Sequence, residues 1–76
     1  MQSIHTPAYR RLVRLLREAR LRSGLTQVEA AAKLRRPQSF VSSCESGQRR
    51  VDVIELNEFA KLYQVSMKWF LKALDP

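Results

Sequence analysis

Two capping boxes are the features that most constrain the fold of this chain. Thr26 is followed three residues later by Glu29, and Asp52 is followed at the same interval by Glu55. In a capping box, both side chains accept hydrogen bonds from backbone amides in the first turn, so the pair marks where a helix begins. Two helix starts are therefore fixed, and each helix has only a short stretch of chain before the next break.

Further start and stop signals divide the rest of the chain into short helices. Pro7 suits a first helical turn, and Gly24 can adopt the positive φ that ends a helix. Pro37 breaks the chain after Leu34 and can open a new helix, and Ser66 is a further N-cap. The predicted helices cover about residues 7–22, 26–34, 38–46, 53–63 and 66 onward. Because no strand pattern appears, the sequence predicts an all-α, compact five-helix domain.

Apolar residues recur at helical spacing and define the expected core. In the first helix, Arg10, Arg14 and Arg17 fall opposite the leucines, so that helix has a buried face and a basic face. In the third helix, Val41 and Cys44 are expected to point inward, with Phe40 at the margin. The remaining expected core residues are Leu12, Leu15, Leu16 and Ala19 in the first helix, Val53, Leu56, Phe59, Ala60 and Tyr63 in the fourth, and Met67, Trp69, Phe70, Leu71 and Leu74 in the fifth.

Composition limits the classes of function. A chain of 76 residues is expected to form one domain over residues 1–76. Cys44 is the only cysteine and His5 the only histidine, so we expect no disulfide, no metal site and no cofactor. No apolar run approaches the ~20 residues of a membrane span, which favours a cytoplasmic protein. The sequence shows no Ser/His/Asp set, no carboxylate pair in a cleft and no phosphate-cradling glycine loop, and an enzyme is therefore not expected.

The positive charge of the chain is concentrated in its first half. The net charge is +7, and residues 1–36 hold nine basic and two acidic side chains, whereas residues 37–76 hold five of each. This asymmetry favours a polyanionic partner, either nucleic acid or an anionic membrane surface. A role in solubility alone is the simpler alternative. Membrane binding through the first helix fits poorly, because its leucines are needed for the core.

The second and third helices are joined by a tight turn, and the third carries small polar side chains. Such a pair on a basic domain suggests a helix-turn-helix over about residues 26–46. A longer pattern includes L25-T26-Q27, E29, A31, K33-L34, Q38-S39, V41-S42, E45 and G47, and continues in Leu56, Phe59-Ala60, Tyr63 and V65-S66. Through these residues the sequence resembles the lambda repressor and Cro family, also called XRE-type, over roughly residues 12–71.

The resemblance implies that residues 38–46 form a recognition helix that lies in the major groove of double-stranded DNA. Gln38 is then the leading base contact, because its amide can pair with N6 and N7 of adenine. Ser39, Ser42 and Ser43 would be further base contacts, with Ser42 nearer the flank. The implied phosphate contacts are Gln27, Ser46, Gln48, Arg49, Arg50 and Arg36, with Arg35, Arg10 and Arg11 as weaker candidates. The resemblance also implies that Gln27 braces Gln38.

The resemblance also implies a structural ion pair between Arg20 and Glu45. Cys44 is interpreted as a small buried apolar residue, with redox sensing as a weaker alternative. The chain departs from the family pattern at three positions. Arg35 and Gln64 stand where glycine is common, and Pro37 stands where the recognition helix usually has a serine or threonine cap.

These features predict a sequence-specific transcriptional regulator of bacterial or phage type. We expect a repressor that acts as a homodimer on an inverted-repeat operator, because one recognition helix reads only a few base pairs. Candidate dimer contacts are Ile54, Leu62, Trp69 and Leu74. The alternative is an antitoxin-type interaction module whose main partner is another protein, such as a toxin.

Overall fold

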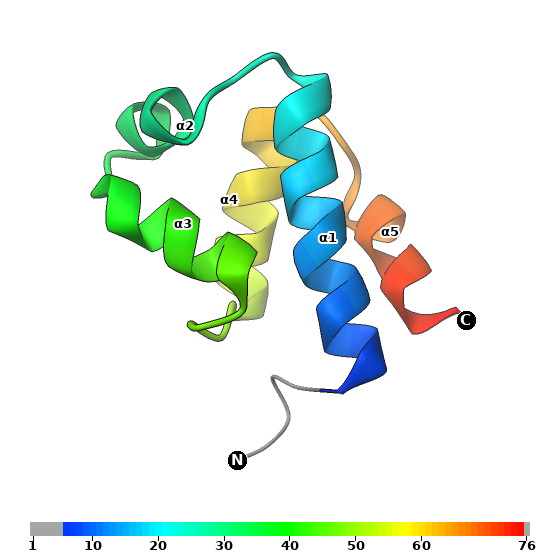
Figure 1. The fold of residues 1–76 in the computed structure, drawn as a ribbon. Coiled ribbons are helices and arrows are strands. Elements are labelled where there is room, and N and C mark those ends of the chain that lie inside the picture. Colours follow the sequence, from blue (N-terminus) through cyan, green and yellow to red (C-terminus); the bar gives the residue numbers. More distant parts are fainter. Residues whose placement is uncertain (1–5, 76) are drawn as a thin grey trace.

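The computed structural model describes residues 6–75 and is all-helical over that range. Its elements are α1 (Pro7–Arg22), α2 (Gln27–Leu34), α3 (Gln38–Ser46), α4 (Val53–Tyr63), α5 (Met67–Phe70) and the 3-10 turn η2 (Leu71–Leu74). In Figure 1, α1 runs between the α3–α4 side of the molecule and α5, and α2 with α3 forms one edge. The predicted five-helix architecture is confirmed.

Side-chain caps start most of these helices, as the sequence predicts. Both capping boxes are formed, one by Thr26 with Glu29 and the other by Asp52 with Glu55. Ser66 accepts a hydrogen bond from the Trp69 amide at the start of α5. The helix boundaries are therefore set by local hydrogen bonds, and tertiary packing only has to orient helices that already have defined ends.

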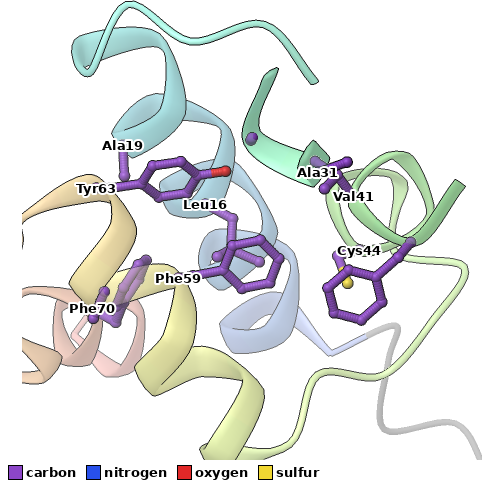
Figure 2. Packing of buried hydrophobic residues seen from close by; sticks show 11 residues of the cluster. Leu16, Ala19, Ala31, Val41, Cys44, Phe59, Tyr63 and Phe70 are labelled. Carbon is purple, nitrogen blue, oxygen red and sulfur yellow. The ribbon is translucent and has the colours of Figure 1, made fainter. Parts of the chain in front are cut away.

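The core forms where α1, α2, α3, α4 and α5 meet, and α2 contributes Ala30 and Ala31. Figure 2 shows Leu16 of α1 packed near Phe59 and Tyr63 of α4, with Phe70 of α5 on one side and α3 on the other. The rings of Phe40 and Phe59 stack with centroids 5.7 Å apart, and those of Phe59 and Tyr63 with centroids 5.8 Å apart. The aromatic rings of α4 thus connect the α3 side of the core to the C-terminal side.

Three details differ from the sequence analysis. Val53 is 65% exposed instead of buried, because as the first residue of α4 it directs its side chain away from the core that the helix packs against. The predicted fifth helix is a single α-turn that continues as η2, and Leu71 and Leu74 are exposed. Phe40, placed at the margin, is buried.

The C-terminal segment is held against α1. Arg11 Nε donates a hydrogen bond to the Ala73 carbonyl oxygen at 2.7 Å, and Ala73 is buried. Figure 1 shows α5 and η2 alongside the N-terminal half of α1, on the side away from α3. This arrangement leaves α3 with one face against the core and the opposite face uncovered by the rest of the described chain.

Candidate nucleic-acid interface

The face of α3 that points away from the core carries the side chains singled out in the sequence. Val41 and Cys44 are fully buried, whereas Gln38 and Ser39 are exposed. Ser42 and Ser43 are partly exposed, and the Ser42 hydroxyl donates to the Ser39 carbonyl oxygen at 3.3 Å. The exposed side of α3 is therefore a surface of short, uncharged donors and acceptors, which suits close approach to base edges.

A polar network ties this face to the first two helices. Glu45 accepts two hydrogen bonds from Arg20, Nε to Oε2 at 2.7 Å and Nη2 to Oε1 at 3.1 Å. The same Oε1 accepts a hydrogen bond from Gln27 Nε2 at 3.1 Å. Gln27 Oε1 in turn accepts one from Gln38 Nε2 at 3.5 Å. We call these four residues the orienting network.

The charged end of the orienting network is buried and its other end is exposed. The side chains of Arg20 and Glu45 are 9% and 5% exposed. The hydrogen bond to Glu45 raises the pKa of Arg20. Arg20 Nη1 also donates to the Leu25 carbonyl oxygen at 2.9 Å, which fixes the loop before α2. The pair therefore joins α1, α3 and the start of α2.

The turn between α2 and α3 keeps its geometry without glycine. Arg35 takes the left-handed conformation, with φ 59°. The Arg36 amide then donates to the Ala31 carbonyl oxygen at 3.0 Å, a bond that closes the end of a helix. Pro37 gives α3 no side-chain cap. Gln64 takes the same left-handed conformation after α4, with φ 58°. Both departures from glycine are thus accommodated as strained backbone and not as altered turns.

Arg36 and Arg49 are held by an acidic partner and an aromatic ring. Both guanidinium groups lie over the Phe40 ring, at 4.4 Å and 4.9 Å from its centroid. Both also pair with the buried carboxylate of Glu55, and Arg36 pairs in addition with Glu58 at 3.3 Å. Sequence reasoning missed this cluster, because its members become neighbours only when α3 and α4 pack together.

Tyr9 is a second residue that the sequence analysis missed. Its hydroxyl accepts a hydrogen bond from the Val51 amide at 2.8 Å and donates to the Arg49 carbonyl oxygen at 3.3 Å. Burial raises the pKa of this hydroxyl. The segment after α3 is therefore anchored to the first turns of α1, which no local pattern in the sequence could indicate.

The other implied phosphate contacts lie at the two ends of α3 and near it. The Ser46 hydroxyl donates to the Ser43 carbonyl oxygen at 3.2 Å and accepts from the Gln48 amide at 3.4 Å. Gln48 and Arg50 are exposed, and Arg35 is exposed in the turn before α3. Arg11 is directed to Ala73 of η2 instead, so its side chain belongs to the packing of the C-terminal segment.

The sequence and the fold of this chain are similar to those of known proteins. The helix-turn-helix domain family matches residues 11–67 of this chain. A solved structure described as an XRE-family like protein, from Pseudomonas syringae pv. tomato str. DC3000, is 44% identical, with a TM-score of 0.85 over 99% of this chain and 95% of the other. The chain belongs to the XRE family of helix-turn-helix domains. None of the curated proteins matches it. At the level of the family, the XRE domain is a DNA-binding regulator.

The candidate dimer contacts of the XRE domain fall into two groups. Ile54 and Leu74 are 68% and 65% exposed. Leu62 and Trp69 are half-buried and pack against the core, so they offer less free surface than the helical pattern predicts. Leu74 also borders an apolar hollow of about 280 Å³ between α1, α4 and η2, together with Leu12, Leu56 and Leu71.

The single thiol of the XRE domain lies in the core. Cys44 is fully buried, and burial raises the pKa of its thiol to about 11. Within residues 6–75 there is no group of three His, Cys, Asp or Glu side chains that could hold a metal ion, and His5 lies outside the described residues. None of the helices in that range is long and apolar enough to cross a membrane.

Proposed function

We propose that the XRE domain is a sequence-specific regulator of transcription that binds double-stranded DNA as a homodimer and acts as a repressor. The observation that carries this proposal is the exposed polar face of α3, which a buried ion pair fixes in place. In helix-turn-helix proteins the second helix of the motif enters the major groove. Here α3 would enter the groove and α2 would cross the backbone.

Base contacts in the proposed complex come from the first turns of α3. The Gln38 amide offers one donor and one acceptor, which match N7 and N6 of adenine. Ser39 is exposed beside it, and Ser43 lies one turn further along. Ser42 already donates to the Ser39 carbonyl oxygen, so we assign it a contact at the flank of the site.

Phosphate contacts in the proposed complex surround this face. Gln27 is the first residue of α2, where helix amides and the positive end of the dipole favour a phosphate. Ser46 ends α3, and Gln48 and Arg50 follow it on the anchored segment. Arg36 and Arg49 are already paired with carboxylates, so each would meet a phosphate only by sharing its charge with Glu55.

One recognition helix reads only a few base pairs, and a dimer would double the number of base pairs that are read. Two half-sites on one face of DNA require recognition helices about 34 Å apart. Ile54 and Leu74 are the most exposed of the candidate dimer contacts, and a second copy of the chain would cover them. Repression follows most simply from occupancy of an operator, because residues 6–75 contain no separate sensor domain.

Selection from a random duplex library tests this proposal. At about physiological salt, the recovered sequences should contain an inverted repeat with half-site centres about 10 base pairs apart. Sedimentation with and without the selected duplex should then show two chains per site. If the chain enriches no sequence and remains a monomer, DNA regulation by a homodimer is wrong, and a protein partner such as a toxin becomes the better account of the exposed apolar residues.

A further inference from the structure

We infer that the buried Arg20–Glu45 pair determines base discrimination, because it sets which way the Gln38 amide faces. This inference rests on the proposed function, since it assumes that Gln38 reads a base. It assigns Glu45 and Arg20 a positioning role in addition to their role in stability. Neither side chain needs to touch DNA, because both act through Gln27 in the orienting network.

The order of donors and acceptors along the orienting network follows from the chemistry of its first acceptor, the Glu45 carboxylate. An ionised carboxylate can only accept hydrogen bonds, so Gln27 must present Nε2, and not Oε1, to Glu45. The observed contact is Gln27 Nε2 to Glu45 Oε1 at 3.1 Å. The other end of the Gln27 amide is then necessarily an oxygen, which can only accept.

The same reasoning passes to the exposed end of the network. Because Gln27 presents an oxygen, Gln38 must present Nε2 to it, as in the observed 3.5 Å contact. One Nε2 hydrogen of Gln38 and both lone pairs of its Oε1 remain for DNA. This fixed order of donor and acceptor suits adenine, whereas guanine would set its O6 acceptor against the Gln38 oxygen.

Arg20 holds the first acceptor, Glu45, in a fixed orientation. Its two hydrogen bonds occupy both oxygens of Glu45, and both side chains are almost completely buried. The carboxylate therefore cannot rotate away from Gln27 without losing a charge-assisted hydrogen bond. A glutamine at position 45 has only one acceptor oxygen for the donors of Arg20 and Gln27, so the contact that fixes the Gln27 amide would no longer be assured.

The test compares base discrimination in the wild type and in two variants. Glu45→Gln keeps the shape of residue 45 but replaces one acceptor oxygen of the carboxylate by an NH2 donor. Arg20→Met/Glu45→Met replaces the buried pair by apolar side chains, a change that is often neutral for stability. Each protein is titrated with the selected duplex and with duplexes that carry the other three base pairs at the position assigned to Gln38, after circular dichroism has verified folding.

The wild type should prefer the adenine site over the others by roughly 5- to 150-fold, the range of a bidentate contact. Both variants should lose most of this preference while their affinity for a random duplex stays unchanged. Gln27→Leu should lose it as well. If Gln27 served only as a phosphate contact, that variant would weaken binding to all four duplexes equally.

Two failures can be distinguished. A wild type that selects no site overturns the proposed function, and the inference with it. A wild type that prefers adenine while the folded Arg20→Met/Glu45→Met variant discriminates as strongly overturns only the positioning role. In that case Gln38 would be oriented by the DNA itself.

Discussion

Glu45 of α3 lies between two side chains that the sequence places far from it, with Arg20 Nε on Oε2 at 2.7 Å and Gln27 Nε2 on Oε1 at 3.1 Å. Arg20 and Glu45 thus form a buried ion pair. Removing the carboxylate leaves the Arg20 charge buried without a partner. We expect Glu45→Ala to lower the free energy of unfolding by about 3–5 kcal/mol.

Thermal denaturation followed by circular dichroism measures this loss. Glu18→Ala is the matched control, because it removes an exposed i,i+4 pair with Arg22 whose closest atoms are 3.7 Å apart. That change should alter stability by less than about 0.5 kcal/mol. Equal melting temperatures for wild type and Glu45→Ala would contradict the structural role of the pair.

Tyr9→Phe should destabilise the XRE domain by about 1–2 kcal/mol, because it leaves the Val51 amide without the hydroxyl that accepts its hydrogen bond. Tyr63→Phe is the control. The Tyr63 hydroxyl is buried and has no hydrogen-bond partner within residues 6–75, and Figure 2 shows its oxygen inside the core. Removing it should leave stability unchanged or raise it. Urea denaturation of both variants checks the contrast, and equal losses would refute it.

The two arginines that follow α3 should behave differently in DNA binding. Arg50→Ala should lower the slope of log K against log salt concentration by about one unit and leave the melting temperature unchanged. Arg49→Ala should also lower the melting temperature, since it deprives the buried Glu55 of a partner. Fluorescence anisotropy at several salt concentrations measures the slopes. A stable Arg49→Ala variant with an unchanged salt slope would show that Arg49 serves neither role.

Stability should fall in alkaline solution. Burial raises the pKa of the Cys44 thiol from its ordinary value of 9.0 to about 11, and burial also raises the pKa of Tyr63. The folded chain therefore keeps protons that the unfolded chain releases. The contribution of Cys44 is complete below pH 9.0 and is lost as the pH rises toward 11, by about 2 kcal/mol. Urea denaturation across this range should show a steeper fall for wild type than for Cys44→Ala, and parallel curves would contradict the assignment.

Much of the fold could be predicted because the sequence marks its helix ends locally. The capping boxes at Thr26 and Asp52 involve residues three positions apart, so their hydrogen bonds do not depend on the rest of the structure. The burial of Cys44 followed from helical spacing. Val53 was predicted wrongly because it has the spacing of a buried residue but stands in the first turn of α4, beyond the reach of the core.

The site was less predictable than the fold, because its positioning contacts join distant elements. Tyr9 and Val51 belong to different elements, as do Arg36 and Glu55. Nothing in the neighbouring sequence of these residues indicates that they contact one another. The resemblance to a known family supplied the Arg20–Glu45 pair and the bracing of Gln38 by Gln27, whereas the contact between Gln27 and Glu45 needed the structure.

The central claim, that the exposed face of α3 meets DNA, can be tested most directly by NMR. Titration of the 15N-labelled chain with the selected duplex should shift the amide signals of Gln38, Ser39 and Ser43 most, together with those of Gln27 at the start of α2. The side-chain amide signals of Gln38 should shift as well. Shifts concentrated on the outer face of α1, around Arg14 and Arg17, with α3 unaffected, would contradict the account.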